Sequence, residues 1–192
     1  MFADYQIIAS YNVGDTVVSS VFEPAISDVA EALLTNSELV LELIGNSSSV
    51  EGNEDICNKF ALTRAQAIRK KLMENGVKSK QIRVSSESSY RPLFQSPKTN
   101  WQFMYNNRVE VRWLSPEEMP YEIIAGYYTS EDEALSEVTK WESKKYLAYY
   151  QRIMQNQRPA YRVLLWGYQT EDAASKEAKK LSNEYKRTFV VK

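Results

Sequence analysis

Two stretches in the first half of the chain repeat hydrophobic residues with the period of a helix. Each places them at i, i+4, i+7 and i+11, which is one face of a helix: Phe22, Ile26, Val29 and Leu33, then Ala61, Ala65, Ile68 and Leu72. Gly76 is placed to end the second helix. Strands are predicted at 38–44, 81–85 and 108–113, and Arg91–Tyr105 is predicted as a long loop that contains aromatic residues. Helices interleaved with strands indicate an α+β half.

The second half repeats one pattern forty positions apart. YEIIAGYY (121–128) and YRVLLWGY (161–168) are apolar runs bounded by tyrosines, and each precedes a Ser/Thr-Glu-Asp-x-Ala segment. Ser130 with Glu133 forms a capping box, and Thr170 is the predicted N-cap of the second helix. With further strands at 146–153 and 188–191, this predicts a ferredoxin-like βαββαβ domain. Two helices would cover one face of a four-stranded sheet and leave the other face open.

Strand alternation assigns side chains to the two faces of that sheet. If Ile123, Ala125, Val163 and Leu165 face the helices, then the residues that face outward are Ile124, Arg162, Leu164 and Trp166. Apolar residues on an open face have two explanations. They stack on sugar rings, or they dock against another protein or the first domain.

The segment SPEEMP divides the chain into two domains. Its two prolines predict a linker at 116–120 between a domain at 1–115 and a domain at 121–192. The first 120 residues carry 12 Lys and Arg against 15 Asp and Glu, and the remainder carries 12 against 10. An apolar share of 43% and a charged share of 26% are ordinary for a soluble globular protein, and no window is apolar enough to span a membrane.

The composition excludes several kinds of chemistry. The chain has no histidine, and its one cysteine is Cys57, so zinc sites and Ser-His-Asp catalysis are impossible within it. The 25 acidic residues form no recognisable catalytic pair. We therefore expect no catalytic residue, metal or cofactor. The N-terminus lacks the features of a signal peptide, so we expect either a cytoplasmic protein or a mature or truncated form.

Residues 5–114 resemble the C-terminal OmpA-like domain, an α/β sandwich. The resemblance is strongest at Arg64-Ala65 and at Asn106-Asn107-Arg108-Val109-Glu110. It implies binding of peptidoglycan, with the helix arginine, here Arg64, holding a carboxylate of diaminopimelate in the stem peptide. A turn aspartate normally holds the ammonium, but its place falls on Ser49, fifteen positions before Arg64. The ligand-binding residues that the resemblance implies here are Arg64, Ser49, Asn46 and Arg108.

The helical wheel gives an independent indication for Arg64. It lies about 60–80° from the centre of the buried stripe, at the border of the apolar face. There the guanidinium can clamp an anion, since its fork matches a carboxylate. The alternative is a structural arginine that binds strand-end carbonyls or a local glutamate.

Residues 121–192 are similar to a SPOR domain. That family binds septal glycan strands without stem peptides, on the open face of its sheet. Arg162 matches an arginine that such domains direct at the glycan, and Ile124 takes a place often held by glutamine. Tyr127 and Trp166 are further candidate glycan contacts. RNA-binding modules share the βαββαβ plan, but the absence of a basic patch argues against nucleic acid.

Together these resemblances predict a non-catalytic, two-domain protein that anchors to peptidoglycan. They imply a periplasmic or outer-membrane-associated location in the cell envelope, with stem-peptide contact in the first domain and glycan contact in the second. The alternative is a structural or protein-interaction subunit, bound to another envelope protein, on wall-binding folds that have lost their ligand. A carboxylate-based hydrolase is a third class, which would need a cleft with two facing acids.

Overall fold

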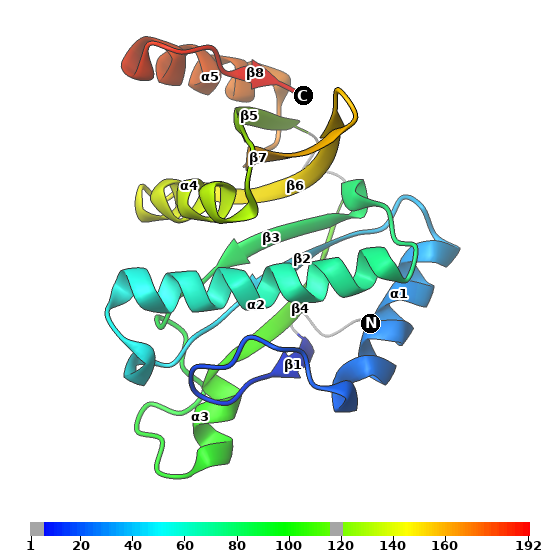
Figure 1. Ribbon diagram of the computed structural model, residues 1–192, viewed down its shortest axis with the longest axis vertical. Coiled ribbons are helices and arrows are strands. Elements are labelled where there is room, and N and C mark those ends of the chain that lie inside the picture. Colours follow the sequence, from blue (N-terminus) through cyan, green and yellow to red (C-terminus); the bar gives the residue numbers. More distant parts are fainter. Residues whose placement is uncertain (1–5, 116–120) are drawn as a thin grey trace. The chain divides into compact units, whose positions relative to one another are not determined.

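The computed structural model describes residues 6–115 and 121–192. The chain divides into a first unit, Met1–Leu114, and a second unit, Ser115–Lys192. Each unit contains its own four-stranded sheet (Figure 1). The predicted linker, 116–120, lies outside the described residues.

The sheet of the first unit has the order β1-β4-β2-β3. Its strands are β1 (Gln6–Ser10), β2 (Val40–Gly45), β3 (Ile82–Ser86) and β4 (Arg108–Leu114). β4 runs antiparallel to both of its neighbours, whereas β2 and β3 run parallel. A parallel pair needs a crossover connection, and α2 (Glu54–Glu74) provides it. The helix packs on β2, β3 and β4 and contacts α1 (Glu23–Thr35).

Local signals in the sequence set the ends of α2. The side chain of Asn53 accepts a hydrogen bond from the Ile56 backbone N–H at 3.0 Å and so caps the first turn. The helix ends at Glu74, and Gly76 follows it with a φ of +93°. There the Val77 N–H donates to the carbonyl of Leu72 at 3.1 Å. The predicted stripe lies within α2 and is fully buried: Ala61, Ala65, Ile68 and Leu72.

Two elements of the first unit were not predicted. β1 is a five-residue run whose pattern is too short to read as a strand from sequence. The predicted loop Arg91–Tyr105 contains most of a helix, α3 (Asn100–Asn106). A capping box between Thr99 and Gln102 starts this helix. Its seven residues are mostly aromatic or amide and carry no apolar stripe, so periodicity could not reveal it. Three short 3-10 turns complete the unit: η1 (Ser20–Phe22), η2 (Ser49–Glu51) and η3 (Ser79–Gln81).

The second unit confirms the predicted βαββαβ order. Its elements are β5 (Tyr121–Tyr128), α4 (Glu131–Ser143), β6 (Leu147–Gln155), β7 (Arg158–Tyr168), α5 (Glu171–Tyr185) and β8 (Val190–Val191). The sheet order is β6-β7-β5-β8, and every pair is antiparallel. The ring of Trp141 on α4 lies 5.3 Å from that of Tyr185 on α5, so the two helices pack side by side on one face.

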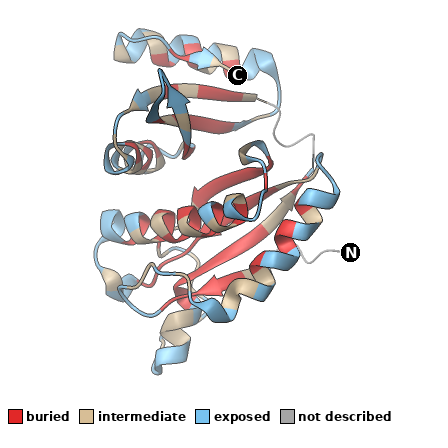
Figure 2. Cartoon of the chain, turned by 45° about the vertical axis from the view of Figure 1, so that its right-hand side comes forward, coloured by how far each residue is buried: buried red, intermediate tan, exposed pale blue. Residues whose placement is uncertain are grey.

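The predicted helix caps of the second unit are confirmed. Ser130 Oγ accepts from the Glu133 N–H at 3.2 Å, and Glu133 reciprocates by accepting from the Ser130 N–H at 3.2 Å. Thr170 Oγ1 accepts from the Ala173 N–H at 3.2 Å. In both units the buried residues follow the strands and the sheet-facing sides of the helices (Figure 2). The repeated sequence pattern therefore encodes two strand-to-helix corners.

Candidate functional site

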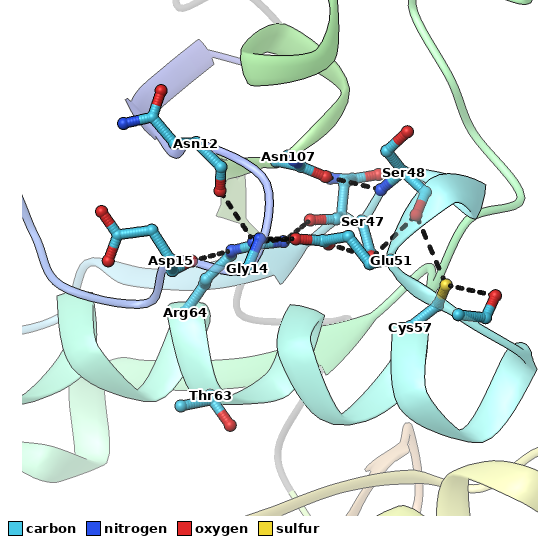
Figure 3. A network of polar contacts seen from close by, with 12 residues as sticks. Asn12, Gly14, Asp15, Ser47, Ser48, Glu51, Cys57, Thr63, Arg64 and Asn107 are labelled. Carbon is cyan, nitrogen blue, oxygen red and sulfur yellow. Dashed lines mark hydrogen bonds and ion pairs between the residues drawn. The ribbon is translucent and has the colours of Figure 1, made fainter.

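Arg64 on α2 is fully buried, and all its hydrogen-bond capacity is used inside the protein (Figure 3). A guanidinium has five N–H donors. Two reach the carboxylate of Glu51, from Nη2 to Oε1 at 2.5 Å and from Nη1 to Oε2 at 2.7 Å. The other three reach backbone carbonyls, of Asp15 at 2.9 Å, of Asn12 at 3.4 Å and of Asn46 at 3.5 Å. Five acceptors match five donors, so none is left for a ligand.

Glu51 is the acidic partner that sequence analysis did not find for Arg64. It ends the turn η2, and its side chain, like that of Arg64, has no exposed surface. Glu51 also accepts from Ser47 Oγ at 2.5 Å and from the Gly14 N–H at 2.8 Å. These contacts are those of the alternative given for Arg64, a structural arginine bound to backbone carbonyls and a local glutamate. The carboxylate comes from two positions beyond Ser49, because the 3-10 turn carries Glu51 back over the helix.

Aromatic rings complete the enclosure of the pair. The guanidinium carbon of Arg64 lies 5.3 Å from the ring centroid of Tyr11 and 5.2 Å from that of Phe60. Such contacts are favourable for a cation over a ring face. Tyr11 follows β1, and the loop after it supplies the Asn12 and Asp15 carbonyls that cap Arg64 (Figure 3). The arrangement is that of a closed internal ion pair.

The Glu51 carboxyl makes the first unit sensitive to acid. Burial alone raises its pKa, but hydrogen bonds from Arg64, Ser47 and Gly14 outweigh burial and lower the pKa below its ordinary value of 4.5. A lowered folded-state pKa stabilises the fold above the ordinary value, and this stabilisation is lost as the pH falls through the folded value. We therefore expect Glu51→Gln to destabilise the first unit near neutral pH. The difference from wild type should shrink below about pH 4.

Amide hydrogen exchange of α2, measured at both pH values, checks this expectation. A difference between wild type and Glu51→Gln that stays constant across the range would show that the carboxylate charge does not matter.

The other candidate residues of the first unit have structural partners or lie apart. Asn46 is buried and donates through Nδ2 to the Ile44 carbonyl and to Glu110 Oε2, both at 3.2 Å. Arg108 is 1% exposed, with Nε 3.1 Å from Glu110 Oε1 and its remaining nitrogens on backbone carbonyls. Glu110 thus joins Asn46 to Arg108. Ser49 is exposed at the start of η2.

The candidate residues of the second unit lie on β5 and β7, around Arg162. In the sheet register, Arg162 is opposite Gln151 on β6 and Tyr127 on β5. Tyr127 is 51% exposed. Ile124 is half-buried and opposite Leu164, while Trp166 is buried at 5% exposure. The structure therefore brings Arg162 and Tyr127 together and places Trp166 four residues further along β7.

A chain of hydrogen bonds crosses the sheet face opposite the helices and ends at Arg162. Tyr149 on β6 donates to Glu122 on β5 at 2.5 Å, so its side chain passes over β7, which lies between these strands. Gln151 Nε2 donates to the Tyr149 hydroxyl at 3.2 Å. Gln151 Oε1 in turn accepts from Arg162 Nη2 at 2.6 Å. This chain holds one edge of the Arg162 guanidinium.

Arg162 differs from Arg64 in how many of its N–H donors bond to other residues of the protein. Within residues 6–115 and 121–192, its Nε is buried and has no hydrogen-bond partner, and the bond to Gln151 uses only Nη2. The side chain is half-buried. Because Nε is buried, a carboxylate would meet the guanidinium at its terminal nitrogens, of which Nη1 makes no bond to the described residues.

Sequence reasoning missed Glu51, Gln151 and Tyr149. Glu51 stands thirteen positions before Arg64 and would be found by a search that allowed a longer turn. Gln151 needs the register of β6 against β7, because no local spacing relates it to Arg162. Tyr149 needs the order of the sheet, because it reaches Glu122 on β5 across β7.

Comparison with known proteins identifies the two units. Residues 11–105 match the OmpA family and residues 118–192 match the SPOR domain. The chain thus carries an OmpA domain followed by a SPOR domain, as the sequence resemblance predicted. Both are non-catalytic domains that bind peptidoglycan. The chain is therefore a peptidoglycan-binding protein of the cell envelope, and not an enzyme.

Solved structures show the same fold at low sequence identity. The peptidoglycan-associated lipoprotein from Burkholderia pseudomallei is 16% identical with a TM-score of 0.53, over 57% of this chain and 91% of that one. The periplasmic domain of Helicobacter pylori MotB is 18% identical with a TM-score of 0.50, over 73% and 83%. No curated protein matches the chain.

Among residues 6–115 and 121–192, no helix is both long enough and apolar enough to cross a membrane. The same residues contain no cluster of three or more side chains able to ligate a metal.

Proposed function

We propose that this protein anchors to peptidoglycan chiefly through its SPOR domain, which would contact the glycan strand in the periplasm. The observation that carries the proposal is the contrast between the two arginines. Arg64 gives all five donors to internal acceptors, whereas Arg162 is half-buried and, among the described residues, bonds only to Gln151, through Nη2. Tyr127, exposed beside Arg162, offers a ring for stacking on a sugar.

The stem-peptide contact implied for the OmpA domain would require Arg64 to leave Glu51. Separating this buried pair costs about 3–5 kcal/mol, because it leaves an unpaired charge in the interior. A stem-peptide carboxylate would have to repay that cost before it gained affinity. The geometry therefore favours a structural role for the Arg64–Glu51 pair.

The buried Arg64–Glu51 pair also suggests a different role for the OmpA domain. A wall-binding fold whose arginine is occupied internally is suited to serve as a structural or protein-interaction module. The partner would be another envelope protein. Under this proposal the SPOR domain supplies wall attachment, and the OmpA domain carries the second contact.

Sedimentation with purified sacculi tests the role of Arg162. We expect Arg162→Ala to weaken binding of the full chain about tenfold or more, since a charge-assisted hydrogen bond is worth about 1.5–3 kcal/mol. The matched control is Lys179→Ala, which removes an exposed cation from the helix side of the same domain. Equal binding by Arg162→Ala, Lys179→Ala and wild type would refute the proposed contact.

A further inference from the structure

The hairpin of β6 and β7 lies in a stretch of the chain that carries basic residues and no acidic residue. Between Glu142 and Glu171 the sequence runs for 28 residues without an acid. The same 28 residues carry five cations: Lys144, Lys145, Arg152, Arg158 and Arg162. The sequence analysis predicted no basic patch, because the balanced charge of the domain as a whole conceals this segregation.

The register of the hairpin separates its arginines between the two faces. Pairing of β6 with β7 is continuous from Leu147 opposite Trp166 to Gln155 opposite Arg158, without a bulge. Side chains therefore alternate faces along the whole hairpin. Arg158 and Arg162, four residues apart on β7, lie on the face opposite the helices. Arg152, opposite Tyr161, lies on the other face.

The face opposite the helices carries one arrangement twice. Arg162 is opposite Gln151, and Arg158 is opposite Gln155. Between these two pairs the register places Ile153 opposite Ala160. The small side chain of Ala160 projects little from the sheet between the two arginines. The two arginine positions are about 13 Å apart along the strand, from the rise of about 3.3 Å per residue. Two cations at this spacing suit a polymeric ligand that carries one anion in each disaccharide unit.

Arg158 is available for such a ligand. It is exposed, and no hydrogen bond or ion pair involves its side chain among the residues that the structure describes. Arg152 is equally exposed and equally unpaired within those residues, but on the opposite face. The two arginines thus form a matched pair that differs mainly in the face they occupy.

We infer that Arg158 and Arg162 together form a two-point site for successive free carboxylates of a glycan strand. In peptidoglycan freed of its stem peptides, the lactyl group on every second sugar ends in such a carboxylate. Each guanidinium can pair with a carboxylate. Beside Arg158 the exposed Gln155 adds an amide for the sugar hydroxyls, whereas Gln151 is buried and holds Arg162. The inference rests on the proposed glycan contact and adds Arg158 and the charge requirement to it.

The test measures the affinity of the full chain for peptide-free glycan strands and for the same strands with their carboxylates methyl-esterified. We expect Arg158→Gln to weaken binding to the charged strands about tenfold, and Arg152→Gln to change it less than twofold. Esterification removes both ion pairs, so it should weaken wild-type binding more than Arg158→Gln does, and it should abolish the difference between the two variants. Added salt should weaken binding only to the charged strands.

The outcomes separate this inference from the function on which it rests. Equal affinity for charged and esterified strands would leave glycan anchoring intact and overturn the carboxylate site. An equal effect of Arg158→Gln and Arg152→Gln would overturn the placement of the site on one face. Absence of binding to either glycan would refute the proposed function itself. Tighter binding to single-stranded RNA than to either glycan would overturn the choice of ligand.

Discussion

Replacing Arg64 with alanine is expected to destabilise the OmpA domain by about 3–5 kcal/mol, which is the cost of leaving a buried charge without its partner. In this variant Glu51 would stay enclosed, without the two short bonds that now neutralise it. Three backbone carbonyls would lose their donor as well. The free energy of opening, measured by amide hydrogen exchange in α2, reports the loss for this domain alone.

Two comparisons make the Arg64 result specific. Lys71→Ala removes a cation from the same helix, but its pair with Glu23 is more than a third exposed, so the expected cost is small beside that of Arg64→Ala. The double variant Arg64→Met with Glu51→Leu should recover much of the loss, because apolar replacement of a buried pair is often neutral. If Arg64→Ala costs no more than Lys71→Ala, the pair does not hold the fold together.

Replacing Gly45 with alanine is expected to destabilise the OmpA domain by about 3 kcal/mol, at the upper end of overpacking costs. A Cβ at this position would lie 2.0 Å from the carbonyl oxygen of Ala61 and 2.5 Å from its carbonyl carbon. Both atoms are backbone atoms of α2, so no side-chain rotation relieves the clash. The helix must move away from β2, and Arg64 one turn further along moves with it.

A glycine in the second unit provides the control for Gly45. In Gly126→Ala the new Cβ would meet the ring and hydroxyl of Tyr128, the nearest at 2.9 Å, which is a side chain able to shift. The expected cost is below about 1.5 kcal/mol. Thermal unfolding of both variants, with hydrogen exchange to assign each loss to its domain, checks the comparison. Similar costs would mean that the close approach of β2 and α2 is not rigid.

The sequence carried most of the architecture because periodicity and capping are local. The stripe of α2 and the Ser130–Glu133 box needed no knowledge of distant residues. α3 was not predicted because a seven-residue helix of mostly aromatic and amide side chains has no apolar stripe to detect. Its boundaries depend on a capping box within a segment that otherwise resembles a loop.

The candidate site was less predictable because its partners are set by register and turn geometry. The position of Arg64 at the end of a strand followed from the helical wheel, and its contact with the Asn46 carbonyl agrees. The identity of its anion depends on how a 3-10 turn folds back to bring Glu51 over the helix, so the sequence could indicate only a local glutamate. Likewise, the positions of Gln151 and Arg158 relative to Arg162 follow only from the alignment of β6 with β7.

Under the proposed function, the two domains of this protein are used differently. In the OmpA domain, buried carbonyls, two aromatic rings and one glutamate absorb the arginine completely. In the SPOR domain, a chain of hydrogen bonds through Tyr149 and Gln151 positions an arginine without saturating it. Attachment to the wall is thus expected to depend on the second domain.

Calorimetric titration of the full chain with two soluble ligands tests this claim most directly. One ligand is a stem peptide that contains diaminopimelate, and the other is a peptide-free glycan strand. The account predicts measurable binding of the glycan, weakened by Arg162→Ala, and no binding of the stem peptide. Binding of the stem peptide that is lost in Arg64→Lys would show that the Glu51 pair opens for a ligand, and would contradict the account.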